Sequence, residues 1–189
     1  MIRTPLLSWL DYGLRCALGI SAASALALVP APALELRGRT YFSSPPLKLT
    51  FRNYYSNAWE AGGEYYFTLL VPPAAGASLG GLRIQQSHGV DWSFPFLVER
   101  SRAFLGEPRR EGRSLPLEVS FEAQARLFMI RFLEPVAPGQ TVTVALRPQR
   151  NPGQADTYLF AVTAFPDGPQ PEGAPLGFAR MPIYDPRPF

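Results

Sequence analysis

Three polar side chains in a proline-bounded element are the strongest candidates for ligand recognition. The element reads Arg-Pro-Gln-Arg-Asn-Pro at residues 147–152. Arg147 and Arg150 could form a displayed fork for a carboxylate, sulfate or sugar, because a guanidinium donates paired hydrogen bonds to planar anions. Alternatively, one arginine pairs with an acid such as Asp156 while Asn151 caps a turn. We favour this structural interpretation and keep Arg147, Arg150 and Asn151 as candidate ligand- or partner-binding residues.

Aromatic side chains form the second group of candidates. Trp59, Tyr66 and Trp92, together with Tyr54 and Tyr55, could stack against sugar rings. The alternative is core and cross-strand packing, which absorbs most aromatic residues in a β-sandwich. Exposure of Trp59, Tyr66 and Trp92 on one face would favour sugar binding, and their burial would remove its basis.

No catalytic constellation is visible around the single histidine. A Ser-His-Asp set would need His88 with Asp91 or Asp156 and with Ser87 or Ser93. Ser87 and His88 are sequence neighbours, which rarely face each other, and the chain has no Gly-x-Ser-x-Gly elbow. We therefore interpret His88 as a surface loop residue. A glycosidase-type carboxylate pair stays open, because such partners meet only in the folded chain.

Metal and phosphate sites lack their usual residues. One histidine and one cysteine do not make an ordinary zinc site, and the acids are not grouped as in a calcium loop. The stretch 76–81 lacks the Gly-Lys-Ser/Thr ending of a phosphate-binding loop. The arginines between residues 99 and 113 alternate with glutamates, which is typical of a solvated, self-paired face. No cofactor or metal is predicted.

The first 33 residues have the pattern of a secretory signal peptide. Arg3 and Arg15 accompany an uncharged apolar run at 16–29, and Pro-Ala-Pro-Ala at 30–33 offers a cleavage site after Ala33. An uncleaved anchor is the alternative, although the run is shorter than the roughly 20 residues that a bilayer requires. Cleavage would remove Cys16, so the exported chain would fold without disulfides.

The charge of the chain argues against nucleic acid as a partner. The formal net charge is +3, and it falls to +2 once Arg3, Asp11 and Arg15 are removed with the signal peptide. Nucleic-acid binding needs a clustered basic face, which this sequence lacks. We predict an exported protein of the periplasm, the thylakoid lumen or the outer cell surface, with no stable membrane span after cleavage.

The elements that must position these residues are short strands. Period-two alternation and turn signals predict about seven to nine strands in an all-β, immunoglobulin-like antiparallel β-sandwich with little helix. Residues 125–133 and 157–165 are apolar on both faces and predict central strands, whereas 141–147 predicts one dry and one wet face. Further strands are expected at 47–52, with Leu47 facing inward, at 64–71, 82–86 and 117–122, and at 176–184 as a last edge strand.

The domain division follows from these strands. Residues 34–46 are expected to be loosely held, 47–184 to form the sandwich and 185–189 to form an extended tail. The least regular region is 87–114, where we expect a short strand or helical turn near 96–104.

A series of motifs resembles a known family. The motifs are Tyr-Tyr-Phe-Thr at 65–68, Leu-Arg-Ile-Gln-Gln at 82–86, Gly-Val-Asp at 89–91, Arg-Ala-Phe-Leu-Gly at 102–106, Pro-Gly-Gln-Thr-Val at 138–142, Leu-Arg-Pro-Gln-Arg-Asn-Pro at 146–152 and Tyr-Leu-Phe-Ala-Val-Thr-Ala-Phe-Pro at 158–166. Over residues 57–184 the chain is similar to a cyanobacterial family of exported proteins known only as a domain of unknown function. The resemblance implies an envelope or lumen location and a sandwich-like domain, and it implies no activity, cofactor or catalytic residue.

Three functions remain open at this point. The first, which we favour, is a non-catalytic exported sandwich that binds an envelope protein or a cell-surface component. The second is a module that binds carbohydrate or another small ligand through Trp59, Tyr66 and Trp92. The third is a hydrolase, which would require His88 or two acids to converge in a cleft.

Overall fold

The computed structural model describes residues 34–36 and 38–186, and this part of the chain is almost purely β-structured. The predicted signal peptide at 1–33, with Cys16, lies outside the described residues, and so do residues 187–189 of the predicted tail. The described part contains 12 strands and one short 3-10 helix, η1 at Val98–Arg100. The predicted antiparallel β-sandwich with little helix is confirmed, with more strands than the seven to nine expected.

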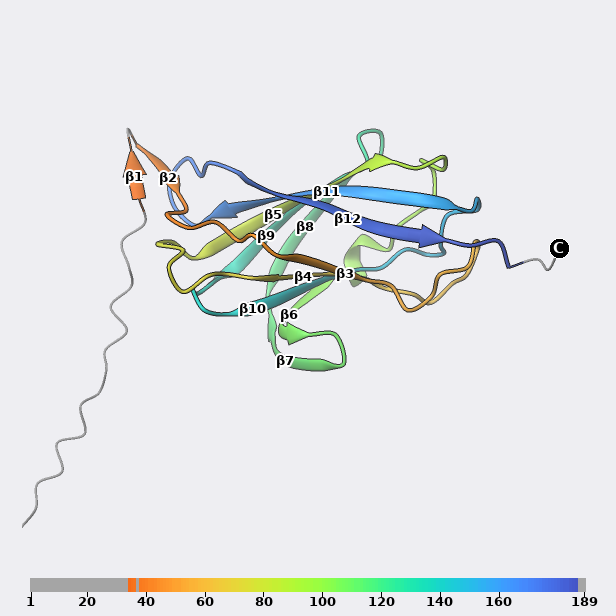
Figure 1. Ribbon diagram of the computed structural model, residues 1–189, viewed down its shortest axis with the longest axis horizontal. Helices are drawn as coiled ribbons and strands as arrows, with labels where there is room; N and C mark the ends of the chain where they lie inside the picture. Colours follow the sequence, from red (N-terminus) through yellow and green to blue (C-terminus); the bar gives the residue numbers. More distant parts are fainter. Residues whose placement is uncertain (1–33, 37, 187–189) are drawn as a thin grey trace, which may run out of the picture.

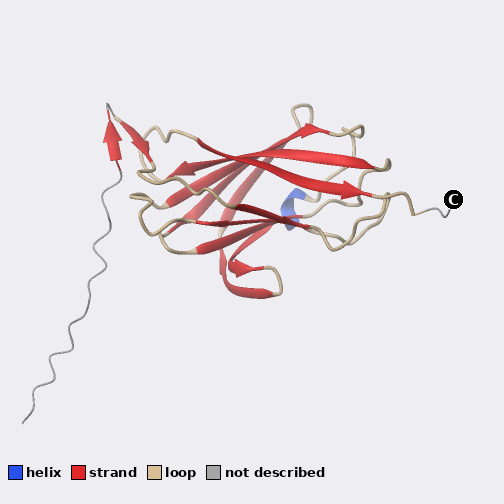
Figure 2. Cartoon of the chain, viewed as in Figure 1, coloured by secondary structure: helices blue, strands red, loops and turns tan. Residues whose placement is uncertain are grey.

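Two five-stranded antiparallel sheets form the layers of the sandwich (Figures 1 and 2). The first sheet has the order β3-β4-β10-β6-β7, with strands at Leu49–Arg52, Tyr65–Leu70, Thr141–Leu146, Arg102–Glu107 and Arg110–Leu115. The second sheet has the order β12-β11-β5-β9-β8, with strands at Ala174–Ile183, Asp156–Pro166, Leu79–His88, Leu127–Val136 and Leu117–Glu122. As the sequence predicts for 157–165 and 176–184, β11 is an interior strand and β12 an edge strand.

A small hairpin precedes the sandwich. It joins β1 (Leu34–Leu36) to β2 (Arg39–Tyr41). Thr40 is fully buried, and both its backbone N–H and its hydroxyl donate to the carbonyl of Pro169, at 3.2 and 2.8 Å. The end of this hairpin is therefore held against the connection between β11 and β12, in contrast to the loose segment expected at 34–46.

Alternating inward side chains from both sheets fill the space between the layers. Val142 and Val144 of the first sheet and Phe160 of the second are almost completely buried. Phe67 meets Phe160 edge-on across the core, with ring centroids 5.9 Å apart. Such an edge-to-face pair adds about 0.5–1.5 kcal/mol beyond the burial of the rings. The described residues include no cysteine, so packing and hydrogen bonds hold the two layers together.

Two strands differ from the sequence prediction in which of their faces are exposed to solvent. The sequence predicts cover on both faces for 125–133, but Met129 and Leu133 of β9 are 44% and 49% exposed. It predicts one wet face for 141–147, but Thr143 and Ala145 of β10 are fully buried. β10 is the middle strand of the first sheet, and the adjoining β6–β7 hairpin covers its outer side, a long-range contact that alternation within one strand does not encode.

The β6–β7 hairpin lies within the region that looks least regular in the sequence. A bulge between Phe104 and Gly106 bends the hairpin. Gly106 has a φ of +98°, and a Cβ there would lie 2.6 Å from the carbonyl oxygen of Arg110, so the bend requires glycine. Near 96–104, where a short strand or a helical turn was expected, the structure has both, as η1 and the start of β6. Leu47, expected to face inward, is 81% exposed and precedes β3.

Candidate functional site

The Arg-Pro-Gln-Arg-Asn-Pro element lies between two loops at one end of the sandwich and is hydrogen-bonded to both. On one side, Leu97 donates its backbone N–H to the carbonyl of Arg147 (2.8 Å). On the other side, the N–H of Asn151 donates to the carbonyl of Glu60 (2.7 Å), and that of Trp59 to the carbonyl of Pro152 (3.1 Å). The backbone of residues 147–152 therefore joins the loop that precedes η1 to the loop between β3 and β4.

Asn151 completes this junction from inside the protein. Its amide nitrogen donates to the carbonyls of Tyr55 (2.8 Å) and Asn57 (2.9 Å), and its Oδ1 accepts the hydroxyl of Tyr65 (2.8 Å). Asn151 is 1% exposed, and burial raises the pKa of Tyr65. Asn151 is thus a buried junction between two loops and the core, which agrees with a structural interpretation of this residue and leaves it out of reach of a ligand.

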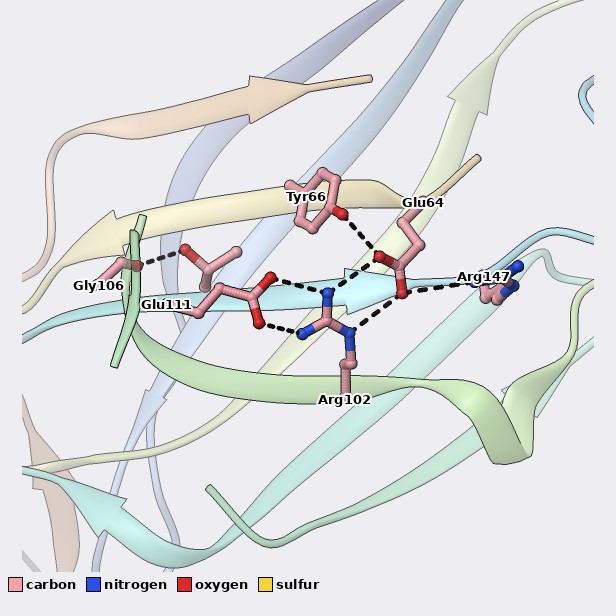
Figure 3. A network of polar contacts seen from close by, with 7 residues as sticks. Glu64, Tyr66, Arg102, Gly106, Glu111 and Arg147 are labelled. Atoms are coloured by element: carbon pink, nitrogen blue, oxygen red, sulfur yellow. Dashed lines mark hydrogen bonds and ion pairs between the residues drawn. The ribbon is translucent and has the colours of Figure 1, made fainter. Parts of the chain in front are cut away.

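Arg147 belongs to a second network, on the outer face of the first sheet (Figure 3). Its Nη1 lies 4.0 Å from Oε1 of Glu64. The acid named in the sequence prediction, Asp156, instead accepts the backbone N–H groups of Val90 (3.0 Å) and Thr157 (2.7 Å). The prediction that one of the two arginines pairs with an acid is confirmed for Arg147, and the choice of Asp156 as the partner was wrong.

Arg102 is the centre of this network, and Figure 3 shows it between two carboxylates. It donates to both oxygens of Glu64, at 3.1 and 3.0 Å, and to both oxygens of Glu111, at 2.6 and 2.9 Å. These hydrogen bonds raise the pKa of Arg102. The bond from Arg102 also lowers the pKa of Glu64, although burial opposes the shift. Arg102 thereby ties the β6–β7 hairpin to the start of β4.

Tyr66 is part of the same network. Its hydroxyl donates to Oε2 of Glu64 (2.6 Å), and burial, followed by this bond, raises the pKa of Tyr66 to about 12. Its ring meets Tyr54 edge-on at 5.8 Å, and the guanidinium of Arg109 lies over Tyr54 at 4.0 Å. Tyr66 is therefore half-buried, with its hydroxyl engaged by Glu64 and its ring against Tyr54.

Arg150 and Trp59 form the exposed part of the element. The Arg150 guanidinium lies 4.7 Å from the centre of the Trp59 ring, and Trp59 is 58% exposed. Trp59 has a φ of +64°, a conformation that costs about 1–3 kcal/mol for a bulky residue and is often associated with function. Gly153 lies against the ring, where a Cβ would come within 2.2 Å of it. A hollow of about 570 Å³ opens beside Trp59, lined by Ala58, Trp59, Gly153, Gln154, Ala155, Asp185 and Pro186.

Trp92 lies in a loop that the adjacent residue, Asp91, connects to Gly153 beside Trp59. Asp91 accepts hydrogen bonds from the N–H and the hydroxyl of Ser93 and from the N–H of Gly153, each at 2.9 Å. Burial raises the pKa of Asp91, but these bonds outweigh it and the net shift is downward. Trp92 is 47% exposed. Arg150, Trp59 and the Trp92 loop thus meet at one end of the sandwich.

The candidates for catalysis do not converge. His88 is exposed at the end of β5, opposite Leu159, while the carboxylate of Asp91 is taken by Ser93 and Gly153. Ser87 donates to the carbonyl of Leu159 at 3.3 Å. Within residues 34–36 and 38–186, no three histidine, cysteine or acidic side chains gather as metal ligands do.

Arg126 is a buried residue that the sequence analysis did not single out. It is 4% exposed, and it donates to the carbonyl of Phe94 (2.9 Å) and to the side chain of Gln86 (3.2 Å). Its guanidinium lies 4.3 Å from the centre of the Phe94 ring, and burial lowers its pKa to about 10. Arg126 has a φ of +53° in the turn of the β8–β9 hairpin. No local pattern distinguishes a turn arginine that folds inward from one that faces water.

Fold and site together define an immunoglobulin-like antiparallel β-sandwich in which the proline-bounded element builds one end. The chain belongs to the DUF2808 family, described as proteins of unknown function, whose model matches residues 39–183. This confirms the membership in a domain family of unknown function that the motifs indicate, and the match begins before residue 57. No curated protein matches the sequence.

Three solved structures illustrate the similarity of this chain to known β-structured domains. A collagen-binding domain from a Staphylococcus aureus adhesin has 3% identity and a TM-score of 0.40, covering 66% of this chain and 89% of its own. The collagen-binding subdomain of the Enterococcus faecalis surface protein ACE has 9% identity and a TM-score of 0.41, covering 70% and 95%. The RrgA Jo.In complex has 12% identity and a TM-score of 0.42, covering 79% and 89%.

Within residues 34–36 and 38–186, no helix is both long and apolar enough to cross a bilayer.

Proposed function

We propose that this protein is an exported, non-catalytic β-sandwich of a bacterial envelope that binds a protein partner or a component of the cell surface. The observation that carries the proposal is the end of the sandwich formed by Trp59, Arg150 and Trp92. Exposed tryptophan and arginine are the residue types most enriched among the energetically dominant residues of interfaces. The cyanobacterial source and the location in periplasm, thylakoid lumen or outer surface belong to the same proposal.

The fate of the other charged groups supports a binding role. Glu64 and Glu111 share Arg102, and Arg147 lies near Glu64, so these two acids and two arginines balance in charge beside the β6–β7 hairpin. Asp91 holds backbone N–H groups. A hydrolase would require His88 or two acids within hydrogen-bonding reach of one substrate atom. In the described residues, no hydrogen bond or ion pair joins His88 to an acid, and the two acids that share one network, Glu64 and Glu111, are both bound to Arg102.

Affinity capture from envelope extracts tests the proposal. The purified protein is immobilised as the wild type, as Trp59→Ala and as Arg150→Ala, and the captured proteins and glycans are identified by mass spectrometry. A partner of this surface should be depleted about tenfold or more by either substitution, since truncation of a dominant interface residue costs about 2 kcal/mol. Leu47→Ala is the matched control, because Leu47 is exposed and lies outside this end of the sandwich. Equal capture by all four proteins would contradict the proposal.

A carbohydrate or other small ligand is the second candidate for the same end of the molecule. The hollow of about 570 Å³ beside Trp59 favours it, because its size is in the range of small-molecule sites. The half-burial of Tyr66 removes one of the three predicted platform residues. Quenching of tryptophan fluorescence by neutral oligosaccharides, lost in Trp59→Ala and kept in Trp92→Ala, would place such a ligand in the hollow.

Export has its own test. Cleavage after Ala33 would remove residues 1–33 and leave Leu34 as the first residue of the exported chain. The intact mass of the protein recovered from the envelope or the medium distinguishes this chain from an uncleaved anchored form.

A further inference from the structure

A second hollow lies on the outer face of the second sheet. It has a volume of about 500 Å³ and is lined by His88, Thr157, Leu159, Phe178 and Arg180, from strands β5, β11 and β12. Its lining contains two side chains that can carry positive charge, a hydroxyl and an exposed aromatic ring, and no acid. None of these five residues belongs to the end of the sandwich discussed above.

The register of the sheet brings the polar groups into one row. Leu159 of β11 pairs with His88 on one side and with Arg180 on the other. Paired residues are about 4.5–5.5 Å apart, so His88 and Arg180 lie about 10 Å from each other with Leu159 between them. Phe178 is two residues from Arg180 along β12, on the same outer face, and is 62% exposed.

An irregularity in β5 turns His88 toward this row. Gln86 pairs with Phe160 and is buried, and regular alternation would place His88 on the same inner face as Gln86. The register shifts between Leu159 and Phe160, so both Ser87 and His88 are exposed. Bulges are over-represented beside functional sites, where they redirect a side chain.

The charge around the hollow is not cancelled within the described chain. Arg180 takes part in none of the ion pairs that hold Arg39, Arg102, Arg113 and Arg131. Asp156, which is adjacent in sequence to Thr157, does not line the hollow. Its carboxylate accepts hydrogen bonds from the backbone N–H groups of Val90 and Thr157. The hollow therefore presents positive charge beside an apolar ring.

We propose that this hollow binds an acidic sugar, either a hexuronate or a sulfated hexose. Arg180 would bind the carboxylate or sulfate through paired hydrogen bonds, and the exposed ring of Phe178 would lie against the apolar face of the sugar. His88 and Thr157 lie within the same hollow and would bond to ring hydroxyls. The exposed aromatic ring and the hydroxyl favour a sugar over an acidic peptide. This site is separate from the surface of the proposed function and does not depend on it.

Calorimetric titration of the purified full chain with defined oligomers tests the ligand class. The acidic probes are tetragalacturonate and sulfated maltotetraose; the neutral controls are the methyl ester of the first and unmodified maltotetraose. We expect one or both acidic probes to bind about tenfold or more tightly than their neutral controls, because hydrogen bonds between a guanidinium and an anion are stronger than those between neutral groups. Absence of binding by both acidic probes overturns the proposal, and so does equal or tighter binding of tetraglutamate.

Matched variants test the location. Arg180→Gln and Phe178→Ala should each weaken the bound acidic probe about tenfold, and His88→Ala should weaken it less. Arg83→Gln is the control, because Arg83 is exposed on the outer face of the same sheet and does not line the hollow. The affinity of this variant for the probe should stay within about twofold of the wild type. Equal losses in Arg83→Gln and Arg180→Gln would show general attraction between charges and contradict the site. Trp59→Ala should bind the probe normally, which separates this result from a failure at the surface formed by Trp59, Arg150 and Trp92. Thermal unfolding of each variant verifies its fold.

Discussion

The outer faces of the two sheets are covered in different ways. On the first sheet, Phe104 faces the same side as Thr143 and is nevertheless only 2% exposed, with the Arg102 guanidinium 5.1 Å from the centre of its ring. On the second sheet, Phe178 is 62% exposed and Met129 44%. The bent β6–β7 hairpin covers the first face, whereas no described element covers the second.

This difference shows that an outward position in a strand does not settle exposure. Thr143 donates its hydroxyl to the carbonyl of Gly106 (2.6 Å) and also shares a hydrogen bond with Thr68 (2.8 Å). The hairpin thus forms a small second core on the outside of the first sheet. The second sheet keeps its apolar and basic side chains available for contact.

The sharpest way to test this contrast is a pair of alanine substitutions. Phe104→Ala should lower the free energy of unfolding by about 3–4 kcal/mol, because it leaves a cavity under the hairpin. Phe178→Ala should change it by less than about 0.5 kcal/mol, since the ring is exposed. Urea unfolding of the two variants measures both values, and similar losses would show that the two faces are equivalent.

Loss of Arg102 should have the next largest effect on stability. Arg102→Ala would leave the carboxylate of Glu64 beneath the hairpin without its main partner, and we expect a loss of about 2 kcal/mol after allowance for solvent screening. Arg100→Ala is the control, since Arg100 is exposed in η1 and has no ion pair among the described residues. A loss in Arg100→Ala equal to that in Arg102→Ala would contradict the role of the network.

Acidification should weaken the same network by a smaller amount. The pKa of Glu64 lies below its ordinary value of 4.5 in the folded chain, so the folded state binds this proton less readily than the unfolded state. Its contribution is therefore complete above about pH 4.5 and is lost as the pH falls through the folded pKa. In Glu64→Gln, the free energy of unfolding should fall less between pH 7 and pH 3 than in the wild type. An unchanged difference would show that Glu64 is not the group involved.

The smallest effect is expected at an exposed ion pair next to the hairpin. Arg113 of β7 pairs with Glu134 of β9, and both side chains are more than half exposed. Arg113→Ala should change the free energy of unfolding by less than about 0.5 kcal/mol, because exposed pairs are screened by water and salt. A loss comparable to that of Arg102→Ala would indicate that general charge balance, and not the Arg102 geometry, holds the hairpin.

The parts of the fold that sequence predicts well depend on local alternation. Tyr65, Phe67 and Leu69 face the core as their spacing predicts, because a single strand fixes which side chains share a face. The prediction that Thr143 lies on a wet face was wrong, because its burial depends on the β6–β7 hairpin, where Gly106 lies 37 residues away in sequence. A polar residue such as threonine gives no sign of what will lie over it.

The candidate site was predictable to a similar extent. Arg150 and Trp59 were identified by residue type, and the structure brings them together. The burial of Asn151 depends on carbonyl groups of the loop at Tyr55 and Asn57, which no local pattern places beside it. The row of His88, Leu159 and Arg180 arises from pairing across three strands and from a register shift, both of which are properties of the assembled sheet.

The burial of Asn151 has a consequence for how relatives are recognised. The most distinctive motif of the chain surrounds a side chain that holds two loops to the core, so the motif records how the end of the sandwich is built. Proteins gathered by this motif should share the shape of that end, while the exposed residues around it, such as Trp59, are free to differ. A shared motif thus indicates a shared architecture at this end of the sandwich. The binding partner is determined by the exposed residues around the motif.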